Sequence, residues 1–211
     1  MADVAAVARE IVLPAPASTG HVAGTSVGGE RLYALEAPDE VLFSAEAIQQ
    51  QVRALAATLS ADYADLRPIL VGILRGSVAF MADLIRAISV PIEVDWLAIS
   101  SYTGQSSSGV VRLLKDLDSD ITERHLILIE DIVDTGLTIN YVMRLLEARQ
   151  PASLKLCALL NKPARRIADR PIDYVGFDVP DVFVVGYGLD YEQRYRNLPY
   201  VAALDPARLP S

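Results

Sequence analysis

The sequence has little sulfur and little imidazole: one cysteine and two histidines among 211 residues. A single cysteine excludes an internal disulfide, and Cys157 lies in an apolar run, which favours a buried structural thiol over a nucleophile. So few thiol and imidazole ligands nearly exclude a zinc site of the usual kind. Two common nucleotide-binding signatures are also missing, because no Gly-x-Gly-x-x-Gly follows a predicted strand and no Gly-Lys-Ser/Thr turn occurs.

Basic clusters and long apolar runs are lacking as well. The net charge is -8 and the pI is about 4.8, which argues against a general binder of nucleic acid or membrane surfaces. No stretch approaches the roughly 18 uncharged apolar residues of a membrane span. Asp3, Arg9 and Glu10 interrupt any apolar core of a secretory signal. We therefore expect a cytoplasmic protein that binds neither nucleic acid nor membranes.

The pattern of apolar residues predicts one domain behind an N-terminal extension. Residues 1–38 are rich in Ala, Gly, Pro and Ser without a sustained period, so we expect a poorly ordered or loosely docked segment there. Residues 39–211 alternate buried-strand runs with helical patterns, which is typical of an α/β fold with a mostly parallel, doubly wound sheet. The two ends of the chain are expected to build a small subdomain. The Ser/Gly-rich segment 100–109 separates two predicted strands, as the tip of a long hairpin that is either a lid or an inert loop.

The most informative stretch runs from Leu126 to Thr138. Four branched aliphatic residues predict a strand buried on both faces, and Glu130 and Asp131 follow at its predicted end. Asp134 then opens a tight polar turn, and a helical pattern begins at Leu137. In an open α/β sheet this order places an anion site where the strand ends and the helix begins. Each part also has an ordinary explanation, since Asp134 could cap the helix and the two acids could be solvated.

The segment from Ile129 to Thr138 resembles the phosphoribosyl diphosphate motif of the type I phosphoribosyltransferases, in which two acids and two apolar residues precede Asp-Thr-Gly and a threonine. Over roughly residues 40–204 the order of motifs is similar to the hypoxanthine-guanine phosphoribosyltransferases of bacterial type. This resemblance implies the type I fold with a small hood subdomain and a mobile hairpin loop. It also implies purine salvage by magnesium-dependent transfer of 5-phosphoribose from phosphoribosyl diphosphate to hypoxanthine or guanine, which yields IMP or GMP and diphosphate.

The resemblance also implies roles for individual residues. Those that would hold the ribose and 5-phosphate are Glu130, Asp131, Asp134, Thr135, Gly136, Leu137 and Thr138. The diphosphate would lie against Arg75, Gly76 and Arg196, and in this family the bond before the first of these residues is often cis. The mobile loop would contribute Ser101 and Tyr102. The purine would contact Lys162, Phe183, Val184 and Asp190. Magnesium would bind Glu130, Asp131 and Asp190.

Asp134 would act as the general base that takes a proton from the purine. The family further implies a homodimer or homotetramer whose partners are otherwise small molecules: phosphoribosyl diphosphate, a 6-oxopurine and a purine nucleoside monophosphate. Two alternatives stay open at this point. One is a related transferase that prefers xanthine, and the other is an RNA-binding regulator of pyrimidine synthesis with the same fold, which the absence of a basic cluster disfavours.

Overall fold

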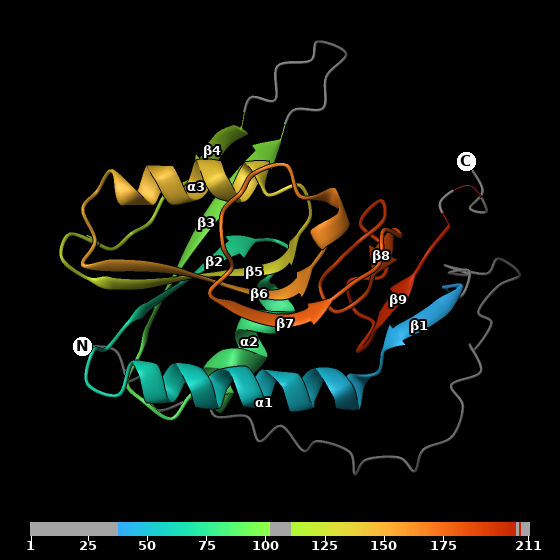
Figure 1. Cartoon of the computed structure of the whole chain (residues 1–211), viewed down its shortest axis with the longest axis horizontal. Helices are drawn as coiled ribbons and strands as arrows, with labels where there is room; N and C mark the ends of the chain where they lie inside the picture. The colour runs from blue at the N-terminus through green and yellow to red at the C-terminus, as the bar shows by residue number, and fades with distance from the viewer. Residues whose placement is uncertain (1–37, 102–110, 206, 208–211) are drawn as a thin grey trace, which may run out of the picture. The chain divides into compact units, whose positions relative to one another are not determined.

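The computed structural model describes residues 38–101, 111–205 and 207 (Figure 1). Almost all of the predicted N-terminal extension lies outside these residues, and so do Tyr102 and most of the predicted hairpin tip. Within the described part, no helix is long and apolar enough to cross a membrane.

A six-stranded sheet forms the centre of the domain, with the order β4-β3-β2-β5-β6-β7. Its strands are β2 Ile69–Leu74, β3 Glu93–Ser101, β4 Val111–Lys115, β5 His125–Val133, β6 Ser153–Asn161 and β7 Tyr174–Asp178. Neighbours pair in parallel except β3 and β4, which pair antiparallel and flank the predicted hairpin tip. The predicted mostly parallel, doubly wound sheet is therefore confirmed.

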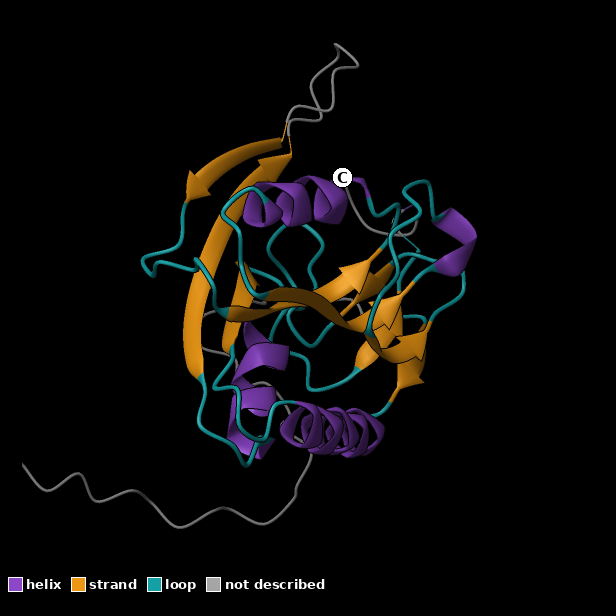
Figure 2. Cartoon of the chain, turned by 60° about the vertical axis from the view of Figure 1, so that its left-hand side comes forward, coloured by secondary structure: helices purple, strands orange, loops and turns teal. Residues whose placement is uncertain are grey.

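Helices cover both faces of this sheet (Figures 1 and 2). The helices α1 Ala45–Asp62 and α2 Val78–Ala87 pack on one face, and α3 Leu137–Glu147 packs on the other. Because successive side chains of a strand point to opposite faces, β5 supplies both layers of the core. Ile127 packs with α1 and α2, and Leu128 packs with α3; both are fully buried.

The first helix begins where the sequence predicts it. Ser44 is its N-cap, and the Ser44 hydroxyl accepts a hydrogen bond from the Ala47 N–H at 3.2 Å. Ile48, Val52 and Leu59 recur at helical spacing and are at most 1% exposed. Burying each such side chain contributes about 1.5–3 kcal/mol, which holds α1 against the sheet.

The two ends of the described chain form a second, antiparallel sheet, as expected. It consists of β1 Glu40–Phe43, β9 Val201–Ala203 and β8 Val184–Val185, in that order. Phe43 of β1 stacks on Phe177 of β7 with 4.2 Å between the ring centroids, and this contact ties the small sheet to the edge of the large one. A 3-10 turn, η1 Pro163–Arg165, follows β6.

One predicted boundary is wrong. The predicted strand stops at Ile129, but β5 continues to Val133, because β6 goes on pairing with it to that residue. The pairing of β2 with β5 ends at Ile129, and β2 then pairs with β3 alone as far as Leu74. Glu130 and Asp131 therefore lie inside β5 but beyond its pairing with β2. The chain leaves β2 and β5 toward opposite faces, so this edge is the switch point where α/β sheets bind ligands.

Candidate active site

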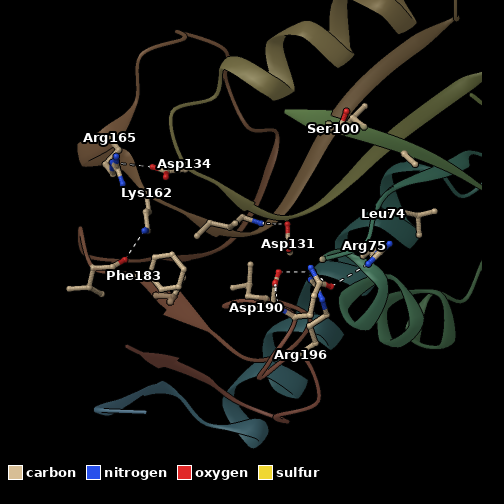
Figure 3. Close-up of a pocket in the computed structure, with 18 of the residues that line it drawn as sticks. Leu74, Arg75, Ser100, Asp131, Asp134, Lys162, Arg165, Phe183, Asp190 and Arg196 are labelled. Atoms are coloured by element: carbon tan, nitrogen blue, oxygen red, sulfur yellow. Dashed lines mark hydrogen bonds and ion pairs between the residues drawn. The ribbon is translucent and has the colours of Figure 1, made fainter. Parts of the chain in front are cut away.

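A pocket of about 1010 Å³ opens at the carboxyl ends of β2, β5 and β6 (Figure 3). Nine of the residues to which the resemblance gives a role line this pocket: Arg75, Gly76, Asp131, Asp134, Lys162, Phe183, Val184, Asp190 and Arg196. They come from loops and strands that are far apart in the sequence. The parallel sheet positions those that follow β2, β5 and β6, and the remainder come from β8 and its neighbouring loops.

The loop after β2 approaches β5 very closely. A Cβ atom at Gly76 would lie 1.7 Å from Oδ2 of Asp131, so no larger residue fits without a shift. The peptide bond between Leu74 and Arg75 is cis. Glycine at position 76 thus lets the loop and the acid share one wall of the pocket.

Asp131 and Glu130 are carboxyls whose pKa values are set mainly by burial. Burial raises the pKa of Asp131 to about 6, although the Ile132 N–H donates to Oδ1 at 2.9 Å and Arg196 also favours the ionised form. Burial and then the charge of Asp131 raise the pKa of Glu130 well above its usual value. Asp131 lines the pocket, whereas the Glu130 Oε2 atom is buried. A cation or a set of hydroxyl donors would stabilise both carboxylates.

A polar cluster of Arg75, Asp190, Gln193 and Arg196 lines one side of the pocket, opposite Lys162 and Phe183. The Arg196 Nη2 atom lies 2.6 Å from Oδ1 of Asp190, and its Nη1 donates to the Gly188 carbonyl at 2.7 Å. The Gln193 N–H donates to Oδ2 of Asp190 at 2.9 Å. Arg75 reaches the same cluster through Nη1, which donates to the Gln193 side-chain oxygen at 3.2 Å. Two guanidinium groups thereby face one region of the pocket, which suits a doubly charged anion.

A buried cation and an exposed ring line the other side. Lys162 is 5% exposed, and its Nζ donates to the Val182 carbonyl at 2.6 Å. Phe183 is 42% exposed, and its ring meets the Tyr191 ring edge to face with 5.8 Å between centroids. An exposed aromatic face near an ammonium group suits a flat heterocycle that carries an oxygen.

Asp134 lies on the same side of the pocket as Lys162, and Arg165 lies beside it (Figure 3). The Arg165 Nε atom is 3.4 Å from Oδ1 of Asp134 and 3.7 Å from Oδ1 of Asp181. Sequence reasoning missed Arg165 and Asp181, which also line the pocket. Their positions just after β6 and just after β7 were the available signal, since residues at the carboxyl ends of parallel strands gather at one edge.

The turn after Asp134 does not use that residue as a helix cap. The N-cap of α3 is Gly136, with φ +77°, a left-handed conformation that favours glycine. The Thr135 carbonyl accepts the N–H groups of Ile167 and Ala168 at 2.9 and 3.1 Å, and this fixes the turn from behind. Asp134 makes no cap hydrogen bond to α3, so the capping alternative is wrong. The Leu137 N–H donates to Oγ1 of Thr135 at 3.4 Å, and the other N–H groups at the helix start suit an anion. The turn residues Thr135 to Thr138 border the pocket region without being among its lining residues.

The mobile-loop residues cannot be placed in the same way. Ser101 ends β3, where its backbone pairs with Val111. Tyr102 lies outside the described residues. The neighbouring Ser100 does line the pocket, so the predicted loop begins at its rim.

Buried polar atoms without a hydrogen-bond partner gather at this site. In the described part of the chain there are three such side-chain atoms: Oε2 of Glu130, Oδ1 of Asp134 and Nε of Arg196. Buried polar groups are nearly always hydrogen-bonded in folded proteins, so the two pocket-lining residues among the three, Asp134 and Arg196, suit a polar ligand. The same described residues hold no group of three or more acidic, histidine or cysteine side chains that could cage a metal. The carboxylates of Asp131 and Asp190 fit a magnesium ion that takes its other ligands from a phosphate and water.

Comparison with known proteins agrees with this architecture. Residues 40–192 match the family described as "Phosphoribosyl transferase domain". The chain therefore belongs to the phosphoribosyltransferase family and is an enzyme of that class. It is 49% identical over 170 residues to the hypoxanthine-guanine phosphoribosyltransferase of Bacillus subtilis, which covers 80% of this chain and 94% of the relative.

Two further relatives carry related names. The hypoxanthine-guanine phosphoribosyltransferase of Mycobacterium tuberculosis is 49% identical over 173 residues, which are 79% of this chain and 86% of the relative. The crystal structure of a hypoxanthine phosphoribosyltransferase from Staphylococcus aureus superposes with a TM-score of 0.78 at 44% identity, over 82% of this chain and 95% of that one. The predicted family and fold are thus confirmed.

Proposed function

We propose that this chain transfers the 5-phosphoribosyl group of phosphoribosyl diphosphate to hypoxanthine or guanine, with IMP or GMP and diphosphate as products. The observation that carries the proposal is one pocket, suited to a polyanion and a flat base, that is lined by Asp131, Asp134 and Arg196. Buried polar atoms of Asp134 and Arg196 have no hydrogen-bond partner there. The names of the similar enzymes support the same substrates.

The phosphoribosyl diphosphate would lie along the β2 and β5 side of the pocket. Its diphosphate would meet the backbone of Arg75 and Gly76 and the Arg196 guanidinium, its ribose hydroxyls would donate to Glu130 and Asp131, and its 5-phosphate would accept N–H groups of the turn before α3. The turn residues concerned are Thr135, Gly136, Leu137 and Thr138.

The purine would occupy the other side. The Lys162 ammonium would donate to the 6-oxo group, and Phe183 would stack on the ring. Backbone groups near Val184 and Asp190 would meet the remaining edge of the base. In this position the reacting nitrogen lies between the base site and the ribose, and the imidazole edge of the purine faces Asp134.

The reaction breaks the bond from the anomeric carbon to diphosphate and forms the bond to the purine nitrogen. Positive charge develops on the ribose and negative charge on the leaving group, so catalysis is mainly electrostatic stabilisation by groups already in place. Arg75 and Arg196 stabilise the leaving diphosphate, and Asp131 stabilises the ribose. Asp134 accepts the proton that the imidazole ring of the purine loses, as a general base.

Magnesium would supply further positive charge against the diphosphate and hold it in position. Asp131 and Asp190 would bind the ion together with substrate oxygens, and Glu130 would contribute directly or through water. The oligomer stays a prediction, which light scattering on the purified protein can check.

The test of the proposal is nucleotide formation from magnesium, phosphoribosyl diphosphate and each of hypoxanthine, guanine and xanthine. We expect IMP and GMP, and a much slower reaction with xanthine. A protein that forms no nucleotide with any of the three purines would refute the proposal, and a clear preference for xanthine would replace hypoxanthine and guanine as substrates.

The role of Asp134 has a matched test. Asp134→Asn keeps the shape but removes the proton acceptor, so we expect kcat to fall about a hundredfold or more with little change in phosphoribosyl diphosphate binding. Asp181→Asn is the control, because Asp181 lines the same pocket and faces the same Arg165. Its kcat should stay within about threefold of wild type, the scale of a partly exposed ion pair. Near-normal turnover of Asp134→Asn would remove Asp134 from this role.

A further inference from the structure

A strained loop joins the small sheet to the polar cluster of the pocket. Gly186, Tyr187 and Gly188 have φ values of +98°, +49° and +101°, all in the left-handed region. A Cβ atom at Gly186 would lie 2.1 Å from the Tyr200 carbonyl oxygen, and one at Gly188 would lie 2.1 Å from that of Gly76. The loop is thus in direct contact with the loop after β2, here called the diphosphate loop, which contains Arg75 and Gly76. Tyr187 is the residue of the Gly186–Gly188 loop that carries a side chain.

Tyr187 is anchored on the helix that follows the diphosphate loop. It is 6% exposed, and its hydroxyl donates to Oδ2 of Asp83, in α2, at 2.6 Å. Gln49 of α1 and Arg86 also donate to the Asp83 carboxylate. Burial acts to raise the pKa of Asp83, but hydrogen bonds from Tyr187, Gln49 and Arg86 hold it below its usual value. Burial and the same hydrogen bond raise the pKa of Tyr187. Both observations describe a firm, charge-assisted bond.

Hydrogen bonds connect the Gly186–Gly188 loop to Arg196 in the pocket. The Tyr187 N–H donates to the Leu198 carbonyl at 2.9 Å, and the Gly188 N–H donates to the Arg196 carbonyl at 3.0 Å. The Arg196 guanidinium returns a hydrogen bond to the Gly188 carbonyl at 2.7 Å and pairs with Asp190 at 2.6 Å. A displacement at Tyr187 would therefore move Arg196 relative to the diphosphate loop.

We propose that Asp83 and Tyr187 are positioning residues that set the place of Arg196 opposite the Arg75–Gly76 loop, and so determine the affinity for the diphosphate group. Neither residue lines the pocket, so both act through the loop from Gly186 to Gly188. The identity of the ligand rests on the proposed function above. Lys162, which would hold the purine oxygen, follows β6 and is fixed by the Val182 carbonyl outside this loop, so base binding should depend less on the bond between Tyr187 and Asp83.

Tyr187→Phe tests the proposal, because it keeps the buried ring and removes the hydroxyl. We expect the Kd for magnesium diphosphate, measured by calorimetry, and the KM for phosphoribosyl diphosphate to rise about tenfold, the scale of a hydrogen bond to a charged group. The KM for hypoxanthine should change less than about twofold. Tyr174→Phe is the matched control, since its hydroxyl donates to Asp62 at 2.8 Å, joining β7 to α1 away from the pocket. It should lower the Tm without changing either constant.

A double-mutant cycle shows whether the two residues act together. Asp83→Asn alone should weaken diphosphate binding, and the double variant should bind diphosphate about as Tyr187→Phe does, since the second change removes a bond already lost. Fully additive losses of diphosphate affinity would contradict the proposal that Asp83 and Tyr187 position Arg196 together.

The outcomes separate the two proposals. Unchanged diphosphate affinity in Tyr187→Phe, or an equal loss in Tyr174→Phe, would overturn the positioning role. Equal rises in the KM values for both substrates would overturn it as well, because a merely structural defect does that. A wild-type protein that binds diphosphate but forms no nucleotide would refute the proposed function, while the calorimetric comparison would still decide the positioning role.

Discussion

Asp131 offers a test of how far the site is built for its ligand at the expense of stability. Its carboxyl is 9% exposed, and burial raises its pKa from 3.8 to about 6. In the magnesium-free protein at neutral pH, Asp131 is therefore ionised where the fold disfavours its charge. Asp131→Asn removes the charge and keeps the shape beside Gly76, so we expect the variant to be more stable and much less active.

The magnitude follows from the pKa. A rise of about two pH units at about 1.36 kcal/mol each corresponds to about 3 kcal/mol of lost stability at pH 7. The folded protein binds the proton more tightly than the unfolded chain. The stability that comes from this tighter proton binding is fully present below about pH 4. It is lost as the pH rises through about 6, the pKa in the folded protein, and it stays lost above that pH. The buried amide of Asn recovers part of it, so we expect a gain of about 1–3 kcal/mol at pH 7.5.

Urea unfolding in EDTA at pH 4, 5, 6 and 7.5 measures this difference. The gain of Asp131→Asn over wild type should be near zero at the lowest pH and should grow up to about pH 6.5. Asp120→Asn is the control, because Asp120 is exposed and hydrogen bonds from the Thr122 N–H and hydroxyl lower its pKa. Its loss should slightly destabilise the protein. A variant at position 131 that is less stable than wild type at pH 7.5, or a gain that is independent of pH, would refute the reasoning.

Three further predictions address the two halves of the pocket and the metal. Gly76→Ala places a Cβ atom 1.7 Å from the Asp131 carboxylate, so kinetics should show a KM for phosphoribosyl diphosphate at least about tenfold higher, with a stability loss of about 1–3 kcal/mol in urea. Lys162→Met keeps the length but removes the ammonium, so the KM for hypoxanthine should rise about tenfold or more, and that for phosphoribosyl diphosphate less than about threefold. Chelation with EDTA should abolish nucleotide formation, and magnesium without substrate should raise the Tm by less than about 1 °C, because the pocket supplies too few ligands by itself.

Each of these predictions has a result that contradicts it. Normal phosphoribosyl diphosphate kinetics for Gly76→Ala would show that the loop can retreat from Asp131. An equal effect of Lys162→Met on both substrates would place the lysine outside the base site. Full activity in EDTA would remove magnesium from the reaction.

The sequence alone determined the fold class and the order of the elements. A run of consecutive aliphatic residues predicts a parallel strand that is buried on both faces. The Asp-Thr-Gly turn, followed by apolar residues at helical spacing, predicts the start of α3. Both predictions succeed because strand burial and turn formation depend on a few neighbouring residues. The edge of the sheet that binds the ligand can also be predicted from the sequence, since the carboxyl ends of parallel strands lie at the same edge. Predicted site residues from the ends of β2, β5 and β6, among them Arg75, Asp131 and Lys162, consequently line one pocket.

Only the tertiary structure decided how these residues interact. The end of β5 depends on pairing with β6 beyond Ile129, and the raised pKa of Asp131 depends on burial beside Gly76, a residue from another strand end. The hydrogen bond between Tyr187 and Asp83 joins residues 104 positions apart, and Arg165 reaches Asp134 from the turn that follows β6. Packing and electrostatics act between segments that are distant along the chain, so a local sequence pattern carries no record of them.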